Sequence, residues 1–197
     1  MSKREQPKDQ PWFTSDSHFG HKNIMYHCQR PFLDVEEMAE TMIERWNEVI
    51  GDSATVYHLG DFTFHRDTEL AEHILDRLSG RIHLIRGNHD SDKLAKLGRW
   101  ESVSDYKTIK YHKQTIRLFH YPMYSWHGKW KGAWALCGHS HGLTKPALPE
   151  EWSGGQLLDV GVDVHDFRPI SFTEVKKIMD WKMERMVEAG MIHVGSR

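Results

Sequence analysis

Residues 55–90 read TVYHLGDFTFHRDTELAEHILDRLSGRIHLIRGNHD, and they contain two short apolar runs separated by a helical pattern. The first run covers residues 55–59 and leads into Gly-Asp, and the second covers residues 81–86 and leads into Gly-Asn-His-Asp. Residues 68–78, which lie between the runs, have the pattern of a helix. Strand-like runs that alternate with helices are typical of an α/β domain.

The same alternation extends towards the N-terminus. Residues 12–15 predict a first strand that ends at Asp16, and residues 35–50 carry an apolar stripe at helical spacing. Asp34 suits the N-cap of that helix, and Gly51 suits its C-terminal stop.

The second half of the chain is richer in strands. Its predicted elements are a short helix at 91–97 and strands at 106–111, 115–120, 134–137 and 157–164. Ser171 and Glu174 form a capping-box pattern at the start of a last helix, predicted over 171–189 and ending before Gly190. The whole pattern predicts an α/β fold in which two β-sheets pack as a sandwich flanked by helices.

Length and composition limit the class of protein. The chain has 197 residues, and no apolar run approaches the roughly 20 residues that span a membrane. Residues 1–11 are expected to be a flexible polar tail without the apolar core of a signal peptide, and residues 12–197 a single domain. Cys28 and Cys137 without a signal peptide favour a cytoplasmic location. The net charge of -2 gives no basic field for stable duplex nucleic-acid binding. The sequence leaves the oligomeric state open.

Metal-ligand residue types follow the predicted strands at their C-terminal ends, where open α/β sheets bind ligands. Five groups occur in this position: Asp16-Ser17-His18, Asp61, Asn88-His89-Asp90, His120 and His139-Ser140-His141. Each group alone has a commoner explanation, such as a helix cap for Asp16, a turn for Asp61 or a hydrogen-bonded core histidine for His120. Five coincidences in order at strand ends are improbable, so the set predicts one metal-binding edge.

Taken together, D-S-H, G-D, G-N-H-D, a later lone His and G-H-S-H resemble the five motifs of the calcineurin-like metallophosphoesterase superfamily. The stretch FTSDSHFGHKNI and the tripeptide HYP also resemble its compact bacterial and phage-type branch. The resemblance implies a four-layer fold, a two-sheet sandwich flanked by helices, and hydrolysis of phosphoesters. It also implies two adjacent metal ions: Asp16, His18 and His141 would hold one, Asn88, His120 and His139 the other, and Asp61 would bridge both.

Mixed carboxylate, amide and imidazole ligands favour Mn, with Fe, Zn, Ni, Co or Mg as alternatives. The metals would activate a water molecule to hydroxide for attack on phosphorus. By the resemblance His89 is the catalytic histidine, and Asp90 is expected to orient it. The chain lacks the second carboxylate and the arginine that follow G-D in the protein-phosphatase branch, so a phosphoprotein substrate is not expected.

Substrate contacts are less well marked than ligands. His21, Lys22 and Asn23 are expected to begin a helix whose first amides could receive phosphate, although solvated loop residues explain them equally well. Arg30, Arg66 and Arg86 could contact phosphate, but pairing on the surface is the commoner role. Residues 121–134 are rich in aromatic side chains that could stack on a nucleobase, and core packing is the commoner explanation.

The favoured function is a metal-dependent hydrolase of small or nucleotide-like phosphodiesters or phosphomonoesters. Because few arginines are placed to neutralise a dianion, diesters are expected to react at least as well as monoesters. Two alternatives remain: a nuclease acting on short single strands, and a non-catalytic scaffold of the same fold. A scaffold would be expected to lose ligands or the G-N-H histidine, and this chain keeps them.

Overall fold

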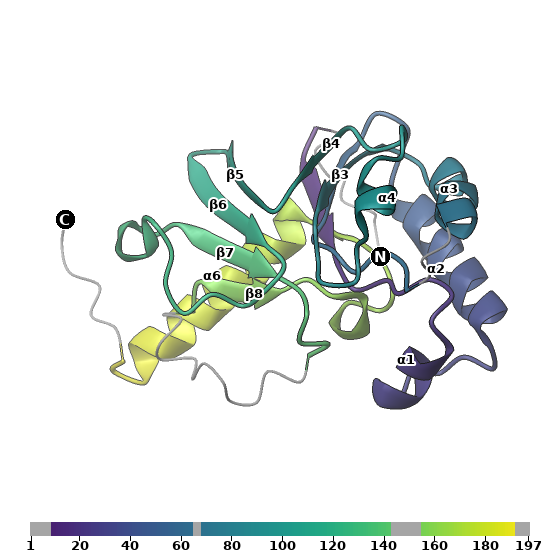
Figure 1. The fold of residues 1–197 in the computed structure, drawn as a ribbon. Coiled ribbons are helices and arrows are strands. Elements are labelled where there is room, and N and C mark those ends of the chain that lie inside the picture. The colour runs from purple at the N-terminus through teal and green to yellow at the C-terminus, as the bar shows by residue number, and fades with distance from the viewer. Residues whose placement is uncertain (1–8, 65–67, 143–154, 192–197) are drawn as a thin grey trace.

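A computed structural model describes residues 9–64, 68–142 and 155–191 (Figure 1). Its first sheet has the strand order β4-β3-β2-β1-β9. The strands are β1 (Pro11–Thr14), β2 (Thr55–His58), β3 (Arg81–Ile85), β4 (Ser102–Ser104) and β9 (Ile170–Ser171). Neighbours among β1 to β4 pair in parallel, and β9 pairs antiparallel to β1.

Helices connect the parallel strands, because a parallel pair needs a long crossover. They are α1 (Lys22–His27), α2 (Val35–Val49), α3 (Thr68–Arg77) and α4 (Asp92–Ala95). Figure 1 shows α2 and α3 on the side of the first sheet away from the second sheet. Met38 and Trp46 of α2 and Ile74 of α3 belong to the same buried core as Val56 and Leu84 of the sheet. The apolar stripes of these helices therefore cover one face of the sheet.

The second sheet has the order β5-β6-β7-β8. Its strands are β5 (Tyr106–Tyr111), β6 (Gln114–Phe119), β7 (Trp134–Cys137) and β8 (Leu157–Asp159). β5 and β6 form an antiparallel hairpin, and β6, β7 and β8 are parallel. His112 and Lys113 turn the hairpin with φ values of 44° and 69°, as a two-residue type I′ loop requires.

A buried core joins the two sheets. Phe13 and Ile85 of the first sheet share it with Leu118 and Leu136 of the second, and Met179 of α6 (Phe172–Glu188) packs into it. The predicted α/β class, with two sheets packed together and flanked by helices, is confirmed. Within the described ranges, no helix is long and apolar enough to cross a membrane.

Several predicted boundaries differ from the structure. The strand predicted at 157–164 ends at Asp159, and the 3-10 turn η2 (Val162–Val164) follows it. The chain leaves β8 there because Gly161 pairs with Ser15 beyond the end of β1. Gly51 does not cap α2 in a left-handed conformation, since the extended Ile50 already ends that helix. The Ser171 and Glu174 capping box and the left-handed Gly190 are confirmed.

Two short strands and the end of the tail were not foreseen. β4 and β9 have three and two residues, too few for an alternating pattern to be recognised. The predicted tail is too long, because Pro11 begins β1 and the buried Gln10 accepts hydrogen bonds from Thr173. Residues 1–8 of that tail lie outside the described ranges. The assignment of residues 12–197 to a single domain stays a prediction.

Candidate metal centre

The loops that follow β1, β2, β3, β6 and β7 meet at one edge of the two sheets. The amide of Asp16 donates to the carbonyl of Gly60 at 2.9 Å, which joins the ends of β1 and β2. The amide of Gly138 donates to the carbonyl of His120, also at 2.9 Å, which joins the ends of β6 and β7. The structure therefore brings the five predicted groups together at one edge of the two packed sheets.

Five of the predicted ligands have left-handed backbones. Their φ values are 58° for Asp16, 50° for His18, 57° for Asp61, 70° for His139 and 49° for His141. Positive φ is uncommon for residues other than glycine, although Asp and His adopt it more readily than most. Such conformations cost conformational free energy and persist only where the surrounding structure holds them. They cluster at functional sites. Here they turn the chain sharply after each strand, so that the side chains converge.

Two glycines allow the carboxylates to sit close to the neighbouring backbone. A Cβ at Gly87 would overlap the carboxylate of Asp61, and a Cβ at Gly138 would overlap the carboxylate of Asp16. Both positions therefore need glycine for close approach to a candidate ligand, whatever their φ values.

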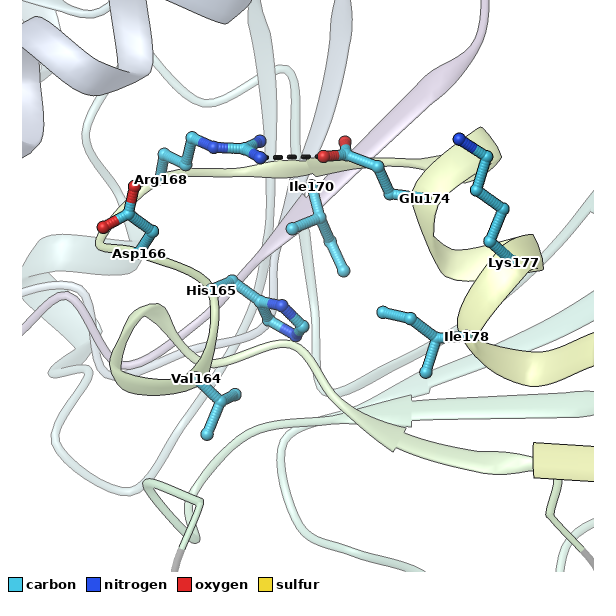
Figure 2. A pocket seen from close by; sticks show the side chains of 8 residues that line it. All are labelled: Val164, His165, Asp166, Arg168, Ile170, Glu174, Lys177 and Ile178. Carbon is cyan, nitrogen blue, oxygen red and sulfur yellow. Dashed lines mark hydrogen bonds and ion pairs between the residues drawn. The ribbon is translucent and has the colours of Figure 1, made fainter. Parts of the chain in front are cut away.

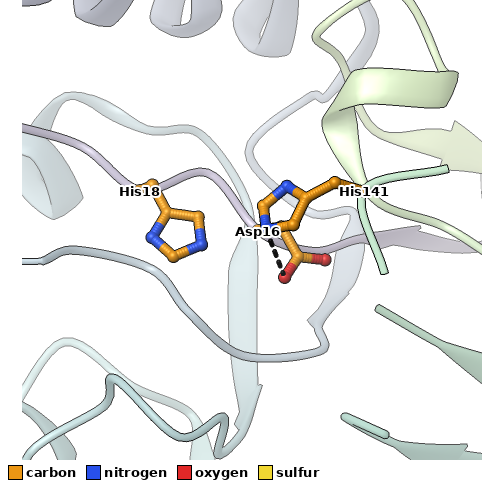
Figure 3. Close-up of side chains that lie close together, drawn as sticks. All are labelled: Asp16, His18 and His141. Atoms are coloured by element: carbon orange, nitrogen blue, oxygen red, sulfur yellow. Dashed lines mark ion pairs between the residues drawn. The ribbon is translucent and has the colours of Figure 1, made fainter. Parts of the chain in front are cut away.

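The first group of candidate ligands consists of Asp16, His18 and His141, whose ligand atoms lie within 4.8 Å of one another (Figure 3). Asp16 is fully buried, and His141 Nε2 lies 3.9 Å from Asp16 Oδ1. His18 is also buried, and neither of its ring nitrogens has a hydrogen-bond partner among the described residues. An orphaned imidazole beside a buried carboxylate fits a metal ion, which would supply the missing partner.

The second group consists of Asp61, His120 and His139, whose ligand atoms also lie within 4.8 Å of one another. Asn88 Oδ1 lies 3.1 Å from His120 Nε2 and 3.0 Å from His139 Nδ1, so it completes this group. His120 Nδ1 donates to the carbonyl of Leu59 at 2.7 Å, which leaves Nε2 directed at the other candidate ligands.

Asp61 lies between the two groups. Its Oδ2 atom is 3.5 Å from His18 Nε2 in the first group and 3.5 Å from His120 Nε2 in the second. Burial raises the pKa of Asp61, but its contacts with His120 and the His89 amide outweigh this effect and lower the pKa to about 2. Asp61 is therefore an anion at neutral pH, within reach of both groups.

Burial strongly shifts the pKa values of two residues in the first group. It raises the pKa of Asp16 to about 7 and lowers the pKa of His18 to about 2. Both shifts have the same origin, because a buried ionised group loses its hydration. A cation between these side chains would offset that loss for the carboxylate and would bind the neutral imidazole. The donor set therefore fits a divalent metal.

His89 and Asp90 occupy different environments. His89 has 38% of its side chain exposed, and its Nε2 lies 3.9 Å from Asp61 Oδ2, at the open side of the site. The sequence predicts that Asp90 orients His89, and this prediction is wrong because the buried Asp90 bonds backbone amides instead. Its carboxylate accepts hydrogen bonds from the amides of Asp61 and Gly87 at 2.8 Å and of Phe62 at 3.0 Å. Asp90 therefore braces the backbone of the two ligand loops.

Of the residues predicted to contact substrate, some lie beside the candidate ligands and others do not. His21 is the N-cap residue of α1, and its ring lies 5.3 Å from that of His18 and stacks on Phe64. His21 thus borders the first group, whereas Asn23 is an exposed residue of α1 whose predicted contact with substrate stays untested. Tyr121 packs its ring edge-on against His139 at a centroid distance of 4.6 Å, so one residue of the aromatic segment also borders the site.

Two of the three candidate arginines are described, and each is paired with an acidic side chain. Arg30 is buried and bonded to Asp163, and Arg86 bonds Asp92 and the carbonyl of Asp90. Arg66 lies outside those ranges.

Asp163 contacts a candidate ligand, although no sequence motif marks it. This residue lies in η2, and its Oδ2 is 2.7 Å from His141 Nδ1. The sequence predicts a continuous strand at this position, although a carboxylate inside the apolar run LLDVGVDV indicates that its side chain needs a buried partner.

Comparisons with known proteins place the chain in a family. It is 34% identical over 170 residues to the uncharacterized protein MJ1445 of Methanocaldococcus jannaschii, which covers 86% of this chain and 90% of that protein. The chain therefore belongs to the same family as this archaeal protein. A solved protein of unknown function from Aquifex aeolicus matches with a TM-score of 0.71 at 26% identity, over 86% of this chain and 99% of its own.

Other matches are partial or weak. The Gene 66 protein of Mycobacterium phage L5 is 35% identical over 116 residues, 57% of this chain and 55% of the phage protein. A solved Streptococcus pneumoniae protein described as a predicted phosphoesterase and a solved E. coli phosphoesterase match with TM-scores of only 0.37 and 0.39, both at 16% identity. No protein-family model matches the sequence.

Proposed function

We propose that this protein is a metal-dependent phosphoester hydrolase of the calcineurin-like metallophosphoesterase superfamily with a two-metal site. One observation carries the proposal: a single carboxylate oxygen, Asp61 Oδ2, lies 3.5 Å from a histidine nitrogen of each ligand group. One metal needs about four to six ligands, and the seven residues gathered here exceed that number in the pattern of two sites with a shared carboxylate. The five motifs support the same assignment.

Two divalent metals in such a site would supply hydroxide at neutral pH and stabilise charge on the phosphate oxygens. The chain would supply the rest of the chemistry. His89 would meet the phosphate or the leaving oxygen from the open side, because its Nε2 faces Asp61 without a close partner nearer than 3.9 Å among the described residues. From there it would donate a proton to the leaving group. Asp90 would keep the loops of Asp61 and Asn88 at fixed separation.

The donor set favours Mn, with Fe, Zn, Ni, Co and Mg as weaker candidates. Small or nucleotide-like phosphoesters are the proposed substrates, and diesters should react at least as well as monoesters. The burial of Arg30 against Asp163 supports this preference, because the charge of that arginine is already paired and cannot neutralise a dianion. A cytoplasmic location stays part of the proposal.

Turnover of bis-p-nitrophenyl phosphate and p-nitrophenyl phosphate after reconstitution with Mn²⁺ tests the proposal. We expect activity that chelator removes and Mn²⁺ restores, with about two ions bound per chain. An Asp61→Asn variant prepared in parallel controls for contaminating phosphatases. Metal-independent activity, or no hydrolysis with any of the six metals, would overturn the proposed function.

A further inference from the structure

A buried network lies behind the first ligand group, on the Nδ1 side of the His141 ring. It consists of Arg30, which follows α1, and Asp163 of η2. We infer that Asp163 and Arg30 are positioning residues that fix His141 and the Asp16 loop for metal binding. The inference rests on the proposed metal site.

The contact between Asp163 and His141 determines which nitrogen of the imidazole can bind metal. Asp163 Oδ2 lies 2.7 Å from His141 Nδ1. An ionised carboxylate can only accept, so Nδ1 carries the proton and donates it. His141 Nε2 then faces Asp16, where a lone pair is needed for a metal. Contacts of this kind orient metal-binding histidines and strengthen their basicity.

Arg30 holds the carboxylate and the ligand loop at the same time. Its Nε and one terminal nitrogen bond the two oxygens of Asp163 at 2.7 and 2.9 Å. The terminal nitrogens also donate to the carbonyls of Asp16 at 2.7 Å and Ser17 at 2.8 Å. These carbonyls belong to the segment in which Asp16 and His18 adopt positive φ. A single buried guanidinium thus supports the strained loop and fixes Asp163 in two directions.

Another assignment of the same side chains is less favourable. The ligand atoms of Cys28, His141 and Asp163 also lie within 4.8 Å of one another, which could indicate a separate metal site. Both oxygens of Asp163 already accept from the Arg30 cation, however, and a metal there would face that positive charge at close range. Support of His141 accounts for these contacts without such repulsion.

The first test uses the wild-type protein loaded with Zn²⁺, which is diamagnetic. Nitrogen-15 NMR of the histidine rings reports the protonated nitrogen of each imidazole. We expect His141 to carry its proton on Nδ1 and to bind metal through Nε2. A His141 ring that binds through Nδ1 would overturn the inference, and this result requires no variant to fold.

The second test measures metal affinity by calorimetry in Asp163→Asn. The first ligand group is the more buried of the two and should give the tighter of two binding events. The loss of charge should weaken that event by about 10–100-fold, while the weaker event changes little. Arg30→Lys, which keeps the charge but loses the paired geometry, should weaken the same event by a smaller factor.

The matched control is Arg168→Gln, which breaks a partly buried ion pair of 2.8 Å between Arg168 and Glu174 (Figure 2). This pair lines a pocket of about 340 Å³ together with His165 and Lys177, and none of these four is a candidate ligand. The control should lose stability without losing metal affinity. Unchanged affinities in Asp163→Asn would overturn the inference and leave the proposed function standing. A wild-type protein that binds no metal would overturn both.

Discussion

The two groups of candidate ligands lie on either side of Asp61, yet they are held in different ways. Asp16 and His18 of the first group are buried, and His141 is backed by the carboxylate of Asp163. In the second group, Asn88 and His139 are exposed and contact each other. His120 is supported by a backbone carbonyl, which carries no net charge.

This difference suggests that the two groups bind metal with different affinities. A rigid group with charged support should bind its metal tightly, because little ordering remains to be done. A more exposed group with neutral support should bind more weakly and exchange more readily, and it lies beside the exposed His89, where substrate would enter.

Asp61→Asn should weaken metal binding by both groups, because Asp61 is the anion that lies within reach of each. We expect weaker binding of both metals and a fall in kcat/KM of more than about 10³-fold, above the cost of losing one electrostatic contact. Calorimetry and turnover of bis-p-nitrophenyl phosphate measure the two effects. Asp180→Asn, which removes an exposed carboxylate of α6, serves as the control. A variant that loses only one metal would show that Asp61 belongs to a single group.

His89→Asn should separate chemistry from metal binding. Because His89 is a proposed proton donor rather than a ligand, kcat should fall by about 10²–10⁴-fold while both metals stay bound. The loss should be smaller for p-nitrophenyl esters than for alkyl esters, since p-nitrophenolate leaves without a proton. His139→Asn is the comparison, and it should reduce metal content itself. Equal loss of metal in the two variants would contradict the assigned roles.

Removal of metal should expose the difference between the groups directly. During titration with a chelator, we expect one ion to leave at about 10–100-fold lower chelator activity than the other, the range attributed to support behind the ligands. His139→Asn should lack the weakly held ion and keep the tightly held one. Loss of both ions in one step would argue for strong coupling through Asp61 in place of two unequal sites.

Local patterns in the sequence are enough to predict which candidate ligands gather at one edge of the fold, but they do not predict contacts between residues that are distant in the sequence. The groups around Asp16, Asn88 and His139 each follow a strand, and the packing of the two sheets brings these strand ends together. The network of Arg30 and Asp163 joins positions 133 residues apart, and no local spacing marks such a pair. Asp163 was further concealed because the run 157–164 has the composition of a strand, whereas pairing of Gly161 with Ser15 ends that strand early.

Asp90 shows that even adjacent positions in the sequence do not always predict a contact between side chains. Its position next to His89 suggests that it orients the ring, but the two side chains diverge, and the oxygens of Asp90 instead accept hydrogen bonds from three backbone amides.

Asp90→Asn should have a smaller effect on metal binding than the variants that remove a candidate ligand. It replaces one acceptor by a donor that faces those amides. The variant should lose about 1.5–3 kcal/mol in the free energy of unfolding, as expected for a hydrogen bond to a charged group. Metal affinity should change less than in Asp163→Asn, because Asp90 supports the backbone and Asp163 contacts a ligand directly. Denaturant unfolding of the two metal-free variants, followed by metal titration, measures both effects. A larger loss of affinity in Asp90→Asn would show that backbone support governs this site more than support of the imidazole does.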